Sequence, residues 1–320
     1  GKITNIDELL DKGIRILEAE IVDALVPNLR SDLLTIGQSK GKFGGGKGSI
    51  WRQTQKKTKE GNVLTFSSMV VVGDKNGHIG IGYGKAKSNF HTHSDWSDGK
   101  NSIGEMVQEA ERLKLRCVAI TDHVGQIAIT NPLNERRLER QSKTIDKLNK
   151  KYNIRILKGA EVDILKNGKL ALSKKAQGKL DIVLASVHMA LKMPVERMTQ
   201  RIVSAMENNR IHILCHPTGR LLEKREPYFV NLDKVFRVAE YKDIFLEINC
   251  HPKRMDLSGE HIKAAKEVGS KFSIGTDAHN VSHLSYLDLG VGLARRGWLE
   301  EKDVLNTFSV RKIDKFLESR

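Results

Sequence analysis

The residues best suited to chemistry in this chain are histidines and carboxylates that recur where short apolar runs end. Five such runs, each as long as a typical buried strand, end in or contain His, Asp or Glu. The residues concerned are Asp122, His123, Glu161, Asp163, His188, His216, Asp277 and His279. The segment 90–99 (FHTHSDWSDG) adds His91, His93 and Asp98. Imidazoles and carboxylates gathered in this way are typical of a metal site.

A histidine or carboxylate that stands alone at a strand end is more often structural, as a hydrogen-bonded ring or a helix N-cap. Here the polar residues recur at one end of successive strands, and buried polar groups need a partner that satisfies them. Imidazole mixed with carboxylate and without thiolate favours Zn, Mn or Fe. More than four ligands imply more than one ion. Such a cluster lowers the pKa of a bound water and stabilises both the attacking and the leaving oxygen of a phosphoryl transfer. The pattern therefore predicts phosphoester hydrolysis.

The elements that must position these residues alternate along the chain from Asn89 onward. Short apolar runs such as 117–123 (CVAITDH) and 181–188 (DIVLASVH) are separated by amphipathic stretches such as 102–114 and 194–208. This alternation predicts an α/β fold with parallel strands covered by helices, as a barrel or an open sheet. In β/α barrels the active site lies at the carboxyl ends of the strands, where these polar residues fall.

The first 88 residues differ in character. Their first thirty residues have apolar spacing that favours a helix, and 37–62 is a glycine-rich basic stretch interpreted as a flexible loop. Residues 63–73 and 78–84 are β-rich and are joined by Asp-Lys-Asn-Gly, which predicts a hairpin. The chain carries 54 Lys and Arg against 39 Asp and Glu, and the net charge of +15 indicates a polyanionic partner.

Composition also argues against several classes of protein. The sequence has no apolar run long enough for a membrane span and no signal-peptide pattern, so the expected location is cytoplasmic. The three cysteines, Cys117, Cys215 and Cys250, are scattered within apolar runs, which indicates buried thiols rather than a disulfide framework. Cys215 is interpreted as a small strand residue and not as a nucleophile.

Residues 89–320 resemble the polymerase-and-histidinol-phosphatase (PHP) domain, in the form found at the C-terminal end of family X DNA polymerases. The motifs that carry the resemblance are, in order, FHTHSDWSDG, AITDH, GAEVDI, SVH, CHPTGR and GTDAH, with HPTGRLLEKREPY, LEINCHPKRMDL and GVGLARRGWLEEKDVLNT pointing to that subgroup. The resemblance implies a distorted seven-stranded β/α barrel, up to three divalent ions (Mn, Zn or Fe), and 3′-to-5′ exonuclease, phosphodiesterase or phosphatase activity. It implies no polymerase activity, because the nucleotidyl-transfer domain has no counterpart here.

The resemblance also implies roles for individual residues. One ion would be held by His91, His93, Glu161 and Asp277, a second by Glu161, His188 and His216, and a third by Asp98, His123 and His279. Within this set Glu161, Asp277 and His279 are also interpreted as catalytic. Arg220 and Arg254 are candidates to bind substrate phosphate, with a surface salt bridge as the alternative. Asn89 departs from the family, which usually has Asp there to support the first histidine, and His251 is either an extra ligand or a surface residue.

Residues 1–88 resemble the archaeal form of the fifth small-subunit ribosomal protein, through IDELLDKGIRILEAEIVDALVPNL, WRQTQKKTKEGN and VVVGDKNGHIGIGYGKAKS. The resemblance implies a truncated α+β piece of a domain similar to double-stranded-RNA-binding domains, whose basic loop contacts ribosomal RNA through phosphates. The residues expected to do so are Lys40, Lys42, Lys47, Arg52, Lys56, Lys57 and Lys59. A solvated charge run is the alternative.

The two partial resemblances meet at Ser88–Asn89, which predicts a fusion of two fragments, either natural or produced by sequence assembly. The function favoured for the whole is a metal-dependent phosphoesterase that processes nucleic-acid 3′ ends. Two other functions stay open at this point. One is a ribosomal RNA-binding component in which the barrel is incidental, and the other is a small-molecule phosphatase of the histidinol-phosphate kind.

Overall fold

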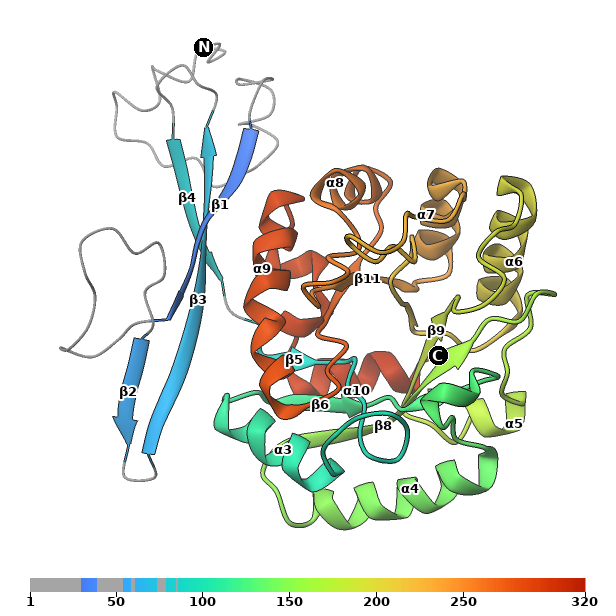
Figure 1. Cartoon of the computed structure of the whole chain (residues 1–320), viewed down its shortest axis with the longest axis horizontal. Helices are drawn as coiled ribbons and strands as arrows, with labels where there is room; N and C mark the ends of the chain where they lie inside the picture. Colours follow the sequence, from blue (N-terminus) through green and yellow to red (C-terminus); the bar gives the residue numbers. More distant parts are fainter. Residues whose placement is uncertain (1–29, 39–53, 59–60, 74–78, 85, 320) are drawn as a thin grey trace.

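The structure, a computed structural model, describes residues 30–38, 54–58, 61–73, 79–84 and 86–319, with side chains from residue 86 onward. Within these residues the chain forms an antiparallel sheet and a larger β/α barrel, shown side by side in Figure 1. The helix expected in the first thirty residues falls on residues 1–29, which lie outside the described residues. Residue 30 is the first residue of a strand.

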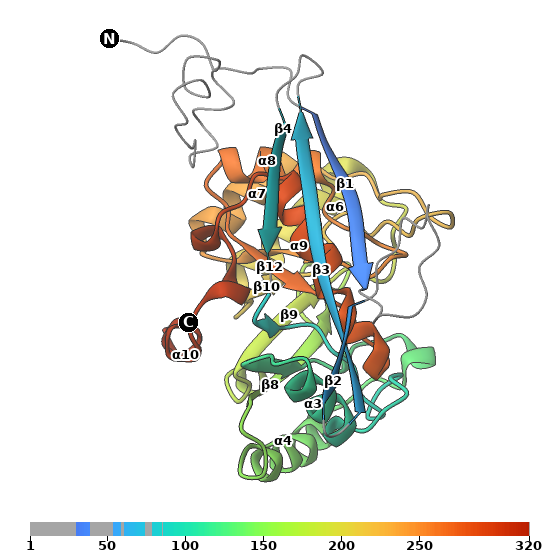
Figure 2. The same cartoon turned by 90° about the vertical axis from the view of Figure 1, so that its left-hand side faces the viewer.

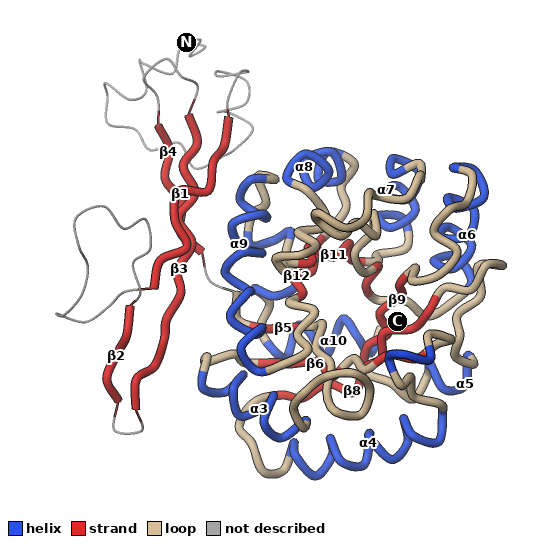
Figure 3. Tube along the Cα trace, in the orientation of Figure 1, coloured by secondary structure: helices blue, strands red, loops and turns tan. Residues whose placement is uncertain are grey.

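The barrel is a ring of parallel strands around a common axis (Figure 3). In the order of their pairing the strands are β12 (Phe272–Gly275), β11 (Phe245–Asn249), β10 (Ile213–Leu214), β9 (Ile182–Ser186), β8 (Arg155–Asp163), β6 (Cys117–Ile120) and β5 (Ser88–Asn89). A parallel bridge between Thr92 and Ala278 joins the two ends of this order and nearly closes the ring. The expectation of a distorted seven-stranded β/α barrel is therefore confirmed.

The distortion comes from strands of unequal length. The strand β8 is long enough to pair with β6 through its first half and with β9 through its second half. Its second half also pairs with the two-residue strand β7 (His123–Val124). By contrast, β5 and β10 each contribute only two paired residues. Regular strand pairing therefore ends early at these two points of the ring.

Helices surround the barrel, and several of them begin at a residue whose side chain caps the first turn. They are α3 (Ile103–Arg112), α4 (Glu135–Asn149), α5 (Lys174–Gln177), α6 (Val195–Asn208), α7 (Leu232–Tyr241), α8 (Gly259–Glu267), α9 (Leu287–Arg296) and α10 (Val310–Glu318), with short 3-10 helices η1 (Ala128–Thr130), η2 (Val281–Tyr286), η3 (Glu301–Asp303) and η4 (Leu305–Thr307). Ser102 caps α3 and forms a reciprocal capping box with Glu105. Ser258 and Ser309 cap α8 and α10 through their side chains.

The interior of the barrel is packed at its amino-terminal end and polar at its carboxyl-terminal end. Alternate strand residues such as Cys117, Ala119, Ile182 and Leu184 form one buried cluster, because successive side chains of a strand point to opposite faces. The helix α10 closes this end, as its Phe316 meets the ring of Phe245 edge to face at 5.0 Å. All three cysteines are buried and free, as expected.

The antiparallel sheet consists of β1 (Arg30–Gln38), β2 (Thr54–Thr58), β3 (Gly61–Gly73) and β4 (Ile79–Gly84), with β3 in the centre. The expected hairpin of β3 and β4 is present. The strand β1 was not foreseen, and Thr54–Thr58 pairs with β3 instead of lying in a loop, because β3 extends far enough to offer it a backbone partner. The sheet runs alongside α9, as Figures 1 and 2 agree.

Candidate metal centre

The structure brings the nine residues predicted to bind metal to one end of the barrel. Their positions follow the carboxyl ends of the strands, as expected for parallel strands whose ends share one rim. In chain order they are His91 and His93 after β5, Asp98 in the next turn, His123 in β7, Glu161 in β8, His188 after β9, His216 after β10, and Asp277 and His279 after β12. Of the four compact groups of described residues that could hold an ion, three are drawn only from these nine, and the fourth joins His91 to Cys215 and Glu247.

Glu161 lies at the centre of this cluster and is only 1% exposed. Its Oε1 is 2.9 Å from Nε2 of His216 and 3.2 Å from Nε2 of His188. Its Oε2 is 3.4 Å from Nε2 of His91 and 3.0 Å from Nδ1 of His123. One carboxylate therefore faces histidines on both sides, which suits a ligand that bridges two ions.

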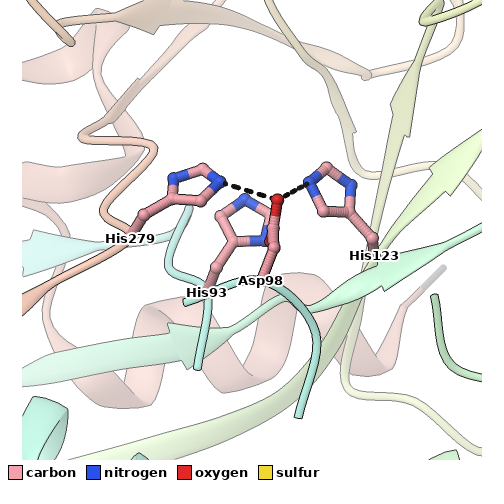
Figure 4. Close-up of side chains that lie close together, drawn as sticks. All are labelled: His93, Asp98, His123 and His279. Carbon is pink, nitrogen blue, oxygen red and sulfur yellow. Dashed lines mark ion pairs between the residues drawn. The ribbon is translucent and has the colours of Figure 1, made fainter. Parts of the chain in front are cut away.

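A second group surrounds Asp98 (Figure 4). Its Oδ2 is 3.6 Å from Nε2 of His123 and 3.5 Å from Nε2 of His279. The ring of His93 stacks against those of His123 and His279, with centroids 4.4 and 4.3 Å apart, respectively. Its Nε2 is 3.2 Å from Oδ1 of Asp277. The implied ligand sets thus overlap in space, because His123 faces Asp98 with one ring nitrogen and Glu161 with the other.

Hydrogen bonds fix which nitrogen each histidine turns inward. The Nδ1–H of His91 donates to Glu247 at 2.5 Å, and that of His188 donates to Asp163 at 2.7 Å. The Nδ1–H of His279 donates to the backbone oxygen of Asp277 at 2.8 Å. When the ring is neutral, as it must be to bind an ion, each of these bonds leaves Nε2 with a lone pair that points into the cluster. Histidines that bind metal are oriented by partners of this kind.

The residues present fit divalent ions. Among the described residues, Nε2 of His91, both ring nitrogens of His93, Nε2 of His188 and Oε2 of Glu161 are buried without a hydrogen-bond partner. Buried polar atoms without partners are rare because each carries a desolvation cost. Nε2 of His91, His93 and His188 all lie near the Glu161 carboxylate, and each neutral ring can offer a lone pair there, so positive ions at this point would satisfy these atoms together.

The electrostatics agree with a site built around anionic carboxylates. Burial alone would raise the pKa of Glu161, but His188, His91 and His123 outweigh it and hold that pKa well below its usual range. The pKa of Asp277 is also held well below its usual range, because His91, His93 and Arg254 outweigh burial. Both carboxylates are therefore ionised and available as ligands at neutral pH.

Backbone strain marks the same site. His216 and Asp277 follow β10 and β12 with φ of 29° and 51°, a region that costs a residue with a side chain about 1–3 kcal/mol. Gly275 precedes Asp277 by two residues, and a Cβ there would lie 2.2 Å from Oε1 of Glu247 and 2.9 Å from Cβ of His91. Glycine is therefore needed at position 275, where β12 passes close to Glu247 and His91.

The support for His91 comes from Glu247 and not from the residue two positions before it. Asn89 donates to the oxygen of His91, to Thr92 and to Thr276, and so holds the backbone at the barrel seam. Sequence reasoning overlooked Glu247. The signal was present as an acidic residue in the middle of the apolar run 244–250 (IFLEINC), where a buried carboxylate requires a partner.

The two remaining acidic residues of the strand-end pattern support the ligands. Asp163 orients His188, as described above. Asp122 is fully buried and accepts hydrogen bonds from the backbone and hydroxyl of Ser94, from Ser97 and from Gln141. These bonds fix the turn between His93 and Asp98, so Asp122 shapes the third ligand group without being close enough to join it.

The two arginines proposed for phosphate binding differ in their surroundings. The guanidinium of Arg220 donates to the backbone oxygens of Arg254 and Met255, so it joins two loops. Arg254 donates from Nε to Oδ2 of Asp277 at 2.9 Å, and its Nη1 is buried without a partner among the described residues. Arg254 therefore offers an unused N–H beside the cluster, whereas Arg220 is engaged in holding the loop.

Few of the basic residues proposed for RNA binding lie within the described residues. Lys56 and Lys57 are on β2, which is paired along one side with β3. Lys40, Lys42, Lys47, Arg52 and Lys59 lie outside the described residues. Their part in RNA binding stays a prediction from the sequence.

Comparison with known proteins confirms both resemblances. Residues 89–251 match the PHP domain family, and residues 50–90 match the N-terminal domain of ribosomal protein S5. The chain is 40% identical over 239 residues to a DNA polymerase/3′-5′ exonuclease PolX of Bacillus subtilis (strain 168), which is 74% of this chain but only 42% of that protein. Over 86 residues it is 46% identical to the small ribosomal subunit protein uS5 of Nanoarchaeum equitans (strain Kin4-M), of which 36% is matched.

A similar fold occurs in a solved structure. The histidinol phosphate phosphatase of Lactococcus lactis, complexed with Zn, L-histidinol and phosphate, superposes with a TM-score of 0.50 at 19% identity. The match covers 66% of this chain and 94% of that one. At this identity the likeness shows the fold alone. In the part of the chain that the structure describes, no helix is long and apolar enough to span a bilayer.

Proposed function

Because the chain belongs to the PHP domain family, we propose that it is a metal-dependent phosphoesterase that acts on nucleic-acid 3′ ends in the 3′-to-5′ direction. The observation that supports this most is the cluster around Glu161, in which one buried carboxylate faces histidines from several strands. Manganese, zinc and iron suit its imidazole and carboxylate ligands.

Within this proposal the nine clustered residues hold up to three ions. Such ions supply Lewis acidity to phosphoryl oxygens and make water a nucleophile at neutral pH. Glu161 and Asp277 would provide negative charge to hold the ions, and Glu247 and Asp163 hold His91 and His188 with Nε2 inward. Arg254 would bind a non-bridging phosphate oxygen through the N–H that has no partner among the described residues.

The preference for nucleic acid rests on the similarity to the polymerase and exonuclease of Bacillus subtilis and on the net charge of +15. A small-molecule phosphatase is the second candidate. It is favoured by the fold shared with the histidinol phosphate phosphatase, because the match covers 94% of that protein's chain. A panel of 3′-ended oligonucleotides and small phosphomonoesters separates the two, because only the first activity shortens the strand.

The test uses the full chain, a 5′-labelled single-stranded oligonucleotide and Mn. The expected result is a ladder of products shortened from the 3′ end. The variant His188→Ala should lose the activity, because it removes a nitrogen 3.2 Å from Glu161. The variant His261→Ala is the matched control, since this histidine lies on α8 outside the cluster. An active His188→Ala variant, or a wild type that cleaves only small monoesters, would contradict the proposal.

For the N-terminal part we propose a contact with ribosomal RNA through its basic residues, supported by the match of residues 50–90 to ribosomal protein S5. The lysines on β2 are the ones to change. The double variant Lys56→Glu, Lys57→Glu should weaken binding of a ribosomal RNA fragment in a gel-shift assay and leave Mn-dependent hydrolysis unchanged. Equal RNA binding by variant and wild type would contradict this contact.

A further inference from the structure

Three aromatic rings form a small cluster at one side of the metal centre. His251 follows β11, and His283 and Tyr286 belong to η2, which follows β12. The ring of His283 lies 5.1 Å from that of His251 and 5.0 Å from that of Tyr286, while His251 and Tyr286 are 5.5 Å apart. His283 and Tyr286 are stacked, and His251 meets both edge to face. All three residues are partly exposed.

This aromatic cluster borders the proposed reaction centre directly. The backbone N–H of His279 donates to Nδ1 of His283 at 3.3 Å, so the cluster adjoins the group around Asp98. On its other side the loop that carries His251 also carries Arg254, which donates to Asp277. A phosphate held between Arg254 and the ions would therefore have the aromatic cluster as a neighbour.

The ring nitrogens of these histidines are already engaged in the loops. Nδ1 of His251 accepts a hydrogen bond from the backbone of Lys253 at 3.2 Å. Both nitrogens of His283 have polar neighbours, since Nδ1 accepts from the backbone N–H of His279 and Nε2 lies 2.9 Å from Nδ2 of Asn280. Neither histidine belongs to a group of ligands close enough to hold an ion in the part of the chain that the structure describes. What the cluster offers a substrate is therefore aromatic surface rather than metal ligation.

We propose that the cluster of His251, His283 and Tyr286 binds the base of the terminal nucleotide by stacking, while the adjacent phosphate occupies the metal centre. This inference rests on the proposed function and narrows its substrate to ends that carry an aromatic base. Stacking tolerates every base because each has a π face, so the site requires a base without selecting one. A phosphoester without an aromatic ring would gain nothing from this surface.

The experiment compares two oligonucleotides of the same length, one ending in a normal nucleotide and one in an abasic residue, with the full chain and Mn. Wild type should remove the normal end with a kcat/KM about 5- to 150-fold higher, the range that one stacked base supports. His251→Ala and Tyr286→Ala should reduce this ratio towards one, mainly by raising KM for the normal end. His251→Phe and Tyr286→Phe keep a ring and should keep the preference.

The ratio is measured within one preparation, so it does not depend on how much of a variant is folded. A wild-type ratio near one would overturn the stacking site while leaving the phosphoesterase intact, and so would alanine variants that keep the wild-type ratio. Loss of a bound ion in His251→Phe, measured by metal analysis, would make His251 a ligand and also overturn it. Failure of wild type to shorten either oligonucleotide would overturn the proposed function together with this inference.

Discussion

Replacing Glu247 by glutamine tests whether the support behind His91 controls metal binding. Glu247 is 1% exposed, accepts the Nδ1–H of His91 with Oε1, and accepts the backbone N–H of His216 with Oε2 at 2.7 Å. It therefore touches a proposed ligand of each of two ions. A glutamine has the same shape but only one oxygen, so one of the two donors must face an NH₂ group.

The size of the effect follows from the bond that is lost. A hydrogen bond to a charged group contributes about 1.5–3 kcal/mol, which corresponds to about 10- to 150-fold in an equilibrium constant. Loss of a carboxylate partner behind a metal-binding histidine costs about 10- to 100-fold in affinity. We therefore expect Glu247→Gln to bind Mn or Zn at least about 10-fold more weakly than wild type.

The assay is a metal titration against a chelator of known affinity, followed by metal analysis after dialysis. Asp163→Asn is the matched variant, since it weakens the support of His188 and leaves the bond between Glu247 and His91 in place. Thermal unfolding in excess chelator reports whether each variant is folded without metal. If Glu247→Gln is folded and binds every ion within twofold of wild type, the reasoning about His91 is wrong.

Three further predictions concern neighbouring residues. Arg254→Lys should lower kcat/KM for a phosphodiester by about 10- to 100-fold in steady-state kinetics, because it loses a charge-assisted hydrogen bond. Arg220→Ala should mainly lower the melting temperature in thermal unfolding. Burial raises the pKa of Asp256 to about 6, although Thr218 and Arg220 oppose it. Its folded form therefore holds a proton that the unfolded form releases. Between pH 4 and 7 in denaturant titrations, wild type should lose about 2 kcal/mol of unfolding free energy relative to Asp256→Asn, and a constant difference would contradict this. Gly275→Ala should destabilise by about 1–3 kcal/mol and weaken metal binding, because its Cβ would meet Glu247; unchanged binding would contradict the close approach.

The sequence by itself determined the barrel and which polar residues meet at its rim. Parallel strands place their carboxyl ends on one rim, so polar residues at the ends of successive apolar runs, such as His123, His188 and Asp277, had to meet whatever the details of packing. The helices were also predictable where a cap and an amphipathic stretch coincide, as at Ser102 before α3. These are local patterns, and each is complete within a short stretch of chain.

Only the tertiary structure decided how the ligands are supported and shared. Glu247 reaches His91 across 156 positions of sequence, and no local pattern records that pairing. Arg220 and Arg254 look alike in sequence, but backbone oxygens engage the guanidinium of Arg220, whereas Arg254 keeps a buried N–H that has no partner in the described part of the chain. The strand β2 likewise forms where a basic loop was expected, because the length of β3 offers it a backbone partner. Such contacts depend on which elements become neighbours, and spacing along the chain does not contain that information.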